Sequence, residues 1–244
     1  MEIARDIIVN ALNKLLQIDL IPEQNGLQVE GAEKVKKIIF GVSANMALFE
    51  AAVKENAQML IVHHGLFWGH EQKITGVFGK RIKFLIKNNL NLVAYHLPLD
   101  KHPVLGNNAG LAKMLGLKNN QPFGTYKGLK IGFKGTLAKG RSFANILKML
   151  GREGLNFGPK IIKTVAIVSG GAHDMLEEAI REKADLYICG SRDEYVQELA
   201  REGKINFIAM GHYNSEKLGV LALKNYIDKK YKISTKFIDI KNPF

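Results

Sequence analysis

Short apolar segments alternate with amphipathic segments of helical periodicity along most of the chain. Apolar residues recur at helical spacing from Ile3 to Ile18, whereas Met59–Val62 is a continuous apolar run with the length of a buried strand. The predicted strands are 37–42, 59–62, 91–95, 130–137 and 205–210, and the predicted helices are 3–17, 47–56, 79–88, 106–115, 143–151 (N-capped by Ser142) and 214–226. The polar stretch 25–31 is predicted to be a loop. This alternation is typical of βαβ units and a parallel sheet.

The second half of the chain resembles the first. The segment 36–65 aligns with 163–191 with one residue of slippage, so that Val42-Ser43 matches Val168-Ser169. The alternative is a chance resemblance between two generic βαβ units. A duplication predicts an α/β fold with two similar, interlaced α/β domains whose mostly parallel sheets are flanked by helices. The predicted domains are 1–117 with 190–244, which carries the candidate ligands, and a basic domain at 118–189.

The composition is that of a soluble globular protein. The 244 residues are 46% hydrophobic and 24% charged. No apolar run approaches the roughly 20 residues of a membrane span, and the start MEIARDIIVN lacks a signal-peptide core, so we expect a cytoplasmic protein without a membrane partner. Cys189 is the only cysteine, which excludes an intramolecular disulfide and a thiolate metal cluster within one chain.

Positive charge is concentrated in the middle of the chain. The net charge is +12, and the window from Lys101 to His173 holds twelve Lys or Arg residues against one acid, Glu153. A solvated surface would explain this excess, and so would a patch that faces a polyanion such as DNA or RNA. The candidate nucleic-acid contacts are Lys127, Lys130, Lys134, Lys139 and Arg141.

Two adjacent histidines follow the apolar run 59–62. His63 and His64 stand at the carboxyl end of a predicted buried strand, where functional groups gather in parallel sheets. Packing and hydrogen bonding are the alternative role. In the aligned second segment the same positions fall near Cys189–Ser191, so the fold unit itself does not require the histidines. This comparison favours a functional role.

Two further strand ends carry imidazoles and carboxylates. His96, Asp100 and His102 follow the strand 91–95, and His212 and Glu216 follow the strand 205–210 with the spacing of one helical face. Scattered surface and helix-cap roles are the alternative. Nitrogen and oxygen ligands suit Zn, Fe, Mn, Co or Ni. The groups exceed the needs of one ion, whereas two divalent ions roughly 3.5 to 4 Å apart would use them and would generate a hydroxide for hydrolysis.

Three other features carry weaker signals. Ser169–Ala172 lies between a predicted strand and helix and is more typical of a tight turn than of a phosphate loop. Phe67 and Trp68 could stack on a substrate, although packing is the commoner role for such aromatics. Cys189 has no neighbouring base in the sequence and is expected to be a buried core residue.

The motifs IVHHGLFW, YHLPLDKHPVLGNN and GHYNSE, in this order over essentially the whole chain, resemble the Nif-three-like family, also called GTP cyclohydrolase I type 2 homologues. The resemblance implies two similar α/β domains around a dinuclear metal centre and a toroidal homohexamer built as a trimer of dimers. It places the metal ligands at His63, His64, Asp100, His212 and Glu216. His96 and His102 match positions near the centre that do not ligate the ions.

The resemblance and the residues together favour a metal-dependent hydrolase that acts on a small or nucleotide-like substrate, with Asp100 or Glu216 as the bridging carboxylate. A GTP cyclohydrolase activity does not follow, because nothing in this sequence indicates a pteridine-forming site and a fold does not fix a substrate. The alternative is a toroidal DNA- or RNA-binding protein that uses the basic segment, with structural or accessory metals.

Overall fold

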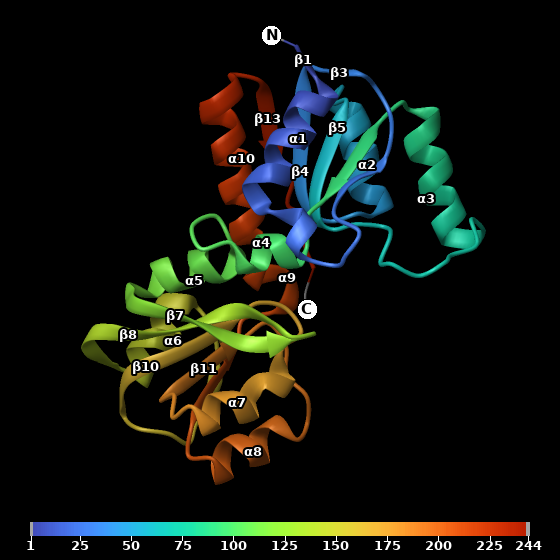
Figure 1. Ribbon diagram of the computed structural model, residues 1–244. Helices are drawn as coiled ribbons and strands as arrows, with labels where there is room; N and C mark the ends of the chain where they lie inside the picture. The colour runs from blue at the N-terminus through green and yellow to red at the C-terminus, as the bar shows by residue number, and fades with distance from the viewer. Residues whose placement is uncertain (1, 243–244) are drawn as a thin grey trace. The chain divides into compact units, whose positions relative to one another are not determined.

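The computed structural model describes residues 2–242, which form two compact units (Figure 1). Unit 1 consists of the chain up to Leu99 together with Val220–Lys241, and unit 2 is chiefly Asp100–Gly219. These bounds differ from the predicted domains 1–117 with 190–244 and 118–189. The physical reason is strand pairing, because strands on both sides of residue 190 belong to one sheet of unit 2.

Unit 1 is built around a five-stranded sheet with the order β13-β4-β5-β6-β2. Only the β6–β2 pair in this sheet is antiparallel. The elements are β1 (Ile3–Ala4), α1 (Arg5–Leu16), a 3-10 turn (Ile18–Leu20), β2 (Gly26–Val29), β3 (Lys34–Val35), β4 (Lys37–Ser43), α2 (Met46–Lys54), β5 (Met59–His64), α3 (Gly76–Lys87), β6 (Asn91–Ala94) and β13 (Ser234–Phe237). The helices α4 (Leu97–Lys101) and α10 (Lys217–Tyr231) each contain a boundary between the units.

The sheet of unit 1 is buried on both faces, which explains why its strands read as continuous apolar runs. Ile39, Leu60, Val62 and Leu92 pack in one cluster with the apolar residues of α2 and α3. Alternate residues of a strand point to the opposite face. That face is covered by α1 and α10, so β5 lies in the middle of the unit (Figure 1).

Unit 2 contains a mixed six-stranded sheet with the order β7-β8-β10-β11-β12-β9. The strands β10, β11 and β12 are parallel to one another. The elements are α5 (Asn107–Leu115), β7 (Leu117–Tyr126), β8 (Leu129–Ser142), α6 (Phe143–Leu150), β9 (Gly154–Asn156), β10 (Ile161–Val168), a 3-10 turn (His173–Met175), α7 (Leu176–Arg181), β11 (Leu186–Cys189), α8 (Val196–Glu202), β12 (Asn206–Ala209) and α9 (His212–Ser215). Apolar residues of α5 and α6 pack on one face of the sheet, and α7 and α8 lie on the other (Figure 1).

The register of the strands supports the predicted duplication. Phe40 pairs with Ile61 in unit 1, and Ile167 pairs with Ile188 in unit 2, which is the same pairing shifted along the chain. At this register His63 corresponds to Gly190, and Val42 corresponds to Ser169, one residue away from the Val168 with which the sequence alignment matched it. The two units therefore repeat one βαβαβ layout, as the aligned segments predicted.

A buried asparagine occupies the same place in each repeat. Asn91 begins β6, and Asn206 begins β12; both are fully buried. Asn91 accepts a hydrogen bond from the Gly31 N–H and donates to two carbonyls, those of Ala32 and Gln58.

Asn206 makes the equivalent set of contacts in unit 2. It accepts from the Gly158 N–H and donates to the carbonyls of Pro159 and Asp185. Each side chain thus bonds three backbone groups of the adjoining segments; the Gln58 and Asp185 carbonyls also accept a backbone N–H, that of Asn91 and Asn206 respectively.

Most predicted elements are confirmed within a few residues, and the Ser142 hydroxyl accepts the capping hydrogen bond from the Asn145 N–H. The predicted loop 25–31 is wrong in part, because Gly26–Val29 pairs with β6 as an antiparallel edge strand. The strand 130–137 is longer than predicted and forms a hairpin with β7. Within the described residues, no helix combines the length and apolarity needed to cross a membrane.

Candidate functional site

The histidine pair lies at the carboxyl end of β5, a strand with a parallel neighbour on each side. His63 is fully buried and its Nδ1 lies 2.9 Å from the backbone oxygen of Tyr95. Because a carbonyl only accepts, His63 carries its proton on Nδ1 and keeps the lone pair on Nε2. His64 is half-buried, and its Nδ1 lies 3.0 Å from the Ser43 hydroxyl. Both rings are therefore oriented by partners on neighbouring strands.

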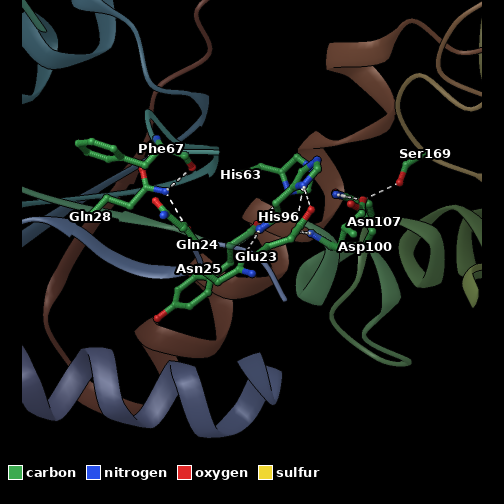
Figure 2. Close-up of polar contacts among 12 residues, drawn as sticks. Glu23, Gln24, Asn25, Gln28, His63, Phe67, His96, Asp100, Asn107 and Ser169 are labelled. Carbon is green, nitrogen blue, oxygen red and sulfur yellow. Dashed lines mark hydrogen bonds and ion pairs between the residues drawn. The ribbon is translucent and has the colours of Figure 1, made fainter. Parts of the chain in front are cut away.

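His96 completes a group of three imidazoles in unit 1. Ring nitrogens of His63, His64 and His96 all lie within 4.8 Å of one another. The His96 Nδ1 faces the carboxylate of Glu23, at 3.2 and 3.3 Å from its two oxygens (Figure 2). A carboxylate on Nδ1 favours the tautomer that carries its proton there and its lone pair on Nε2.

Glu23 is the functional residue that the sequence analysis missed. It lies in the segment 21–25 before β2, where neither a motif nor a periodic pattern links it to a residue more than seventy positions later. Asn25 in the same segment accepts a hydrogen bond from the His96 N–H at 2.8 Å. The signal that could have found Glu23 is its nearness in sequence to β2, which pairs with β6, but that strand was itself predicted as a loop.

The segment after the histidines is held by Gln28. Its Oε1 accepts from the Leu66 N–H at 2.7 Å, and its Nε2 donates to the backbone oxygen of Phe67 at 3.1 Å (Figure 2). The Phe67 ring packs edge-on against Phe78 and contacts the apolar core, which supports a packing role. The Trp68 side chain is 44% exposed, and its ring stands edge-on to His96 at a centroid distance of 5.0 Å. Of the two aromatics, only Trp68 contacts the imidazole group in this way.

In unit 2, Asp100 is buried and oriented by two donors. Its Oδ1 accepts from the Ser169 hydroxyl at 2.7 Å and from the Asn107 side-chain amide at 2.9 Å (Figure 2). The Asn107 Oδ1 in turn accepts from the Gly219 N–H. These contacts tie the carboxylate to α5, to the end of β10 and to the start of α10. Its direction is thus fixed by the fold of unit 2.

His212 begins α9 and Glu216 caps its C-terminus, between α9 and α10, so the predicted shared helical face is interrupted although the two side chains meet. The His212 Nε2 is 3.3 Å from the Glu216 Oε2, and a carboxylate oxygen of Glu216 lies within 4.8 Å of one of Asp100. Glu216 is 2% exposed. Gly170 has φ +71°, and a Cβ there would come within 2.3 Å of Glu216, so the close approach of this loop requires glycine.

The donor types fit a divalent transition ion. In unit 1, His63, His64 and His96 could bind a metal ion through imidazole nitrogen, and in unit 2 Asp100 and Glu216 offer carboxylate oxygens. His63 is oriented by donating to the Tyr95 carbonyl and Asp100 by accepting from the Ser169 hydroxyl, and such outer partners are typical of metal ligands. The residue set is therefore compatible with the predicted metal chemistry.

The polar groups of His102 and of the loop 169–172 form hydrogen bonds with other groups of the protein. The His102 Nδ1 accepts from the N–H groups of Val104 and Leu105, and burial lowers its pKa. The Ser169 N–H donates to Asn108 and the Gly170 N–H donates to Ser215. Since these N–H groups already have partners, the loop is a tight turn and not a phosphate cradle.

The basic candidates lie in and beside the β7–β8 hairpin. Lys130 pairs with Glu178 and Lys134 pairs with Glu182, so acids of α7 and its C-cap offset two of these charges. Arg141 donates to the backbone oxygen of Leu115. Lys127 lies over the ring of Tyr126. Lys139 is exposed.

The Cys189 thiol is fully buried at the end of β11, and burial raises its pKa to about 12. A thiol in this state stays protonated and reacts slowly. We expect Ellman's reagent to label the native protein only at the rate at which unit 2 opens, and to label it fully in denaturant. Rapid stoichiometric labelling of the native protein would contradict this assignment.

Comparisons with known proteins extend over nearly the whole chain. The family model of Duf34/NIF3 (NGG1p interacting factor 3) matches residues 3–243. The chain is 44% identical over 236 residues to a GTP cyclohydrolase 1 type 2 homolog of Archaeoglobus fulgidus, with 96% of each chain covered, and 41% identical over 244 residues to one of Pyrococcus abyssi, covering 96% of this chain and 97% of that one. The crystal structure of TTHA1606 from Thermus thermophilus has a TM-score of 0.91 and 32% identity, and covers 99% of this chain and 100% of its own. This chain belongs to the Duf34/NIF3 family.

Proposed function

We propose that this protein binds two divalent metal ions through His63, His64, Asp100, His212 and Glu216 and hydrolyses a small or nucleotide-like substrate. Two such ions, when bound, lower the pKa of a water molecule towards neutrality and polarise a substrate oxygen, which is the chemistry of hydrolysis. Support comes above all from the orientation of His63, whose Nδ1–H donates to the Tyr95 carbonyl, which fixes the ring and puts the lone pair of the neutral imidazole on Nε2.

The chain's own residues supply the remaining requirements of such a site. The Ser169 hydroxyl and the Asn107 amide hold the Asp100 carboxylate in one direction. Glu23 keeps a proton on the His96 Nδ1, beside His63 and His64. Pre-oriented ligands bind an ion without further loss of side-chain freedom.

The proposed ligands come from both units: His63 and His64 from unit 1, and Asp100, His212 and Glu216 from unit 2. Chain connectivity supports the assignment of these two sets to the same ions. Asp100 follows His96 by four residues, and both flank the start of the short helix α4. Glu216 directly precedes α10, the helix that leads back into unit 1. The covalent links between the two sets are therefore short.

The nucleic-acid alternative receives less support from the described contacts. Counterion release requires cations that can approach phosphates, whereas Lys130 and Lys134 are paired with Glu178 and Glu182. A homohexamer built as a trimer of dimers stays a prediction from the resemblance, and sedimentation velocity would test it.

Metal removal tests the proposed function. We expect elemental analysis to find a divalent transition metal in the purified protein, and a chelator to abolish hydrolysis in a screen of nucleotides and phosphoesters. Adding back Mn, Co or Zn should restore the activity. The melting temperature should fall on metal removal, because ions that bind only the folded state stabilise it.

Two results would contradict the proposal. One is a protein that takes up no metal after incubation with each ion and desalting. The other is a hydrolytic activity that is identical with and without chelator. Metal uptake without any turnover would keep the metal site and remove the hydrolase.

A further inference from the structure

Unit 2 contains a cavity of about 1360 Å³, and His212 is the one proposed metal ligand among its lining residues. Its walls come from the end of α6, from β9 and from the loops that follow β11 and β12. Gly190–Arg192 come directly after β11, and Met210–His212 come directly after β12. The cavity thus lies at the carboxyl ends of two adjacent parallel strands, the edge where open α/β sheets bind ligands.

Three cations line this cavity, namely Lys148, Arg152 and Arg192. Within residues 2–242, none of the three forms an ion pair, and the buried Nε of Arg152 has no hydrogen-bond partner. A buried guanidinium nitrogen without an acceptor is costly, and an anionic ligand would supply the acceptor.

Acids also line the cavity, but two of them are already engaged. Glu198 pairs with Arg201 at 3.1 Å, and Asp193 faces His173 at 3.9 Å. Glu153 and Glu194 are exposed side chains, whereas Arg152 is half-buried. Lys148 and Arg192 are exposed as well, so among the Asp, Glu, Lys and Arg residues that line the cavity only Arg152 is half-buried.

An apolar surface adjoins these cations. Leu155, Phe207 and Met210 line the same cavity, and Phe207 and Met210 are 1% and 6% exposed. Typical small-molecule pockets measure about 300–1,000 Å³ and combine an apolar lining with a few polar groups. This cavity is large enough for a molecule of nucleotide size that carries both an apolar part and an anionic group.

We propose that the cavity binds the substrate of the hydrolase, and that this substrate is a phosphate-bearing molecule of about nucleotide size. Its phosphate contacts Arg152 and Arg192, its apolar part lies on Leu155 and Met210, and one end lies at His212. The link to hydrolysis rests on the proposed function, because His212 both lines the cavity and is an assigned metal ligand. The binding of a phosphate-bearing molecule does not depend on the ions.

Titration calorimetry on chelator-treated protein tests the binding step. The probes are AMP, ribose 5-phosphate and adenosine, which separate the contribution of the phosphate from that of the ring. We expect AMP to bind at least about tenfold more tightly than adenosine, and Arg152→Gln and Arg192→Gln each to weaken AMP binding about tenfold or more. Arg181→Gln is the matched control, because Arg181 is an exposed arginine of unit 2 outside the cavity.

Equal affinity for AMP and adenosine, unchanged AMP binding in both cavity variants, or the absence of binding by all three probes would overturn the inference. Weakened binding in Arg181→Gln would overturn it as well, since the effect would then be one of net charge. Metal uptake is measured on separate portions of the same preparations, after incubation with Mn, Co or Zn and desalting. Normal metal uptake with no effect of the arginine variants rejects the cavity and keeps the proposed function. Loss of AMP binding in the variants of a protein that takes up no metal supports the cavity and rejects the hydrolase.

Discussion

Replacing His63 with alanine is expected to lower the affinity for divalent metal by at least about 100-fold, since loss of even an outer partner of a metal ligand costs roughly 10–100-fold. The imidazole is fully buried and its Nδ1–H is already used by the Tyr95 carbonyl. A smaller side chain at this position leaves no donor atom for the ion. The measurement is a competition titration with a chromophoric chelator.

His70→Ala is the matched control for this substitution. His70 belongs to the same stretch of sequence but is exposed, and its Nε2 contacts the side chain of Gln72. We expect its metal affinity to equal that of the unmodified protein. Equal affinities in His63→Ala and His70→Ala would remove His63 from the ligand set, and circular dichroism of both variants would show that each is folded.

Replacing Asn91 or Asn206 with alanine is expected to lower the free energy of unfolding by about 2 kcal/mol or more. Each substitution leaves one N–H and one carbonyl without their side-chain partner, at about 1–3 kcal/mol for each unsatisfied group, and removes one of the two hydrogen bonds that the Gln58 or Asp185 carbonyl accepts. Urea denaturation of chelator-treated protein measures the change without a contribution from bound metal.

The two substitutions should lower the free energy of unfolding by similar amounts but loosen different parts of the chain. Hydrogen exchange is expected to increase at Gly31 in the Asn91 variant and at Gly158 in the Asn206 variant. Those are the backbone N–H groups that donate hydrogen bonds to the two asparagine side chains. Asn145→Ala, an exposed position in α6, serves as the control and should change stability by less than about 0.5 kcal/mol. A loss below about 1 kcal/mol in either buried variant would contradict the role of these networks.

The central part of the fold could be predicted from the sequence because its strands are buried on both faces. Met59–Val62 has no polar residue to obscure the pattern, and α1 shows a regular apolar stripe. The strands that were missed are polar. β7 has the sequence LKNNQPFGTY and is mostly exposed, and β2 is a four-residue edge strand. Their pairing depends on partners that local periodicity does not reveal.

The candidate site also has one part that local sequence predicts and another that depends on contacts between distant segments. His63, His64, His212 and Glu216 were predicted because each follows an apolar strand, so local sequence gives both the residue and its position. Glu23 acts on His96 through a contact between distant segments. The cavity of unit 2 is assembled from α6, β9 and two strand-end loops, none of which carries a motif of its own. Contacts and cavities of this kind arise only when the chain is folded.

The equivalence of His63 with Gly190 has a consequence for how the two repeats diverged. A Cβ at Gly190 would lie 2.5 Å from the Gly170 carbonyl oxygen and 2.7 Å from the Ser215 hydroxyl. Unit 2 therefore has no room for an imidazole at the strand end where unit 1 carries one. The two copies have become asymmetric in a way that a single substitution cannot reverse: restoring a histidine at position 190 would require the loop at Gly170, which lies against Glu216, to move as well.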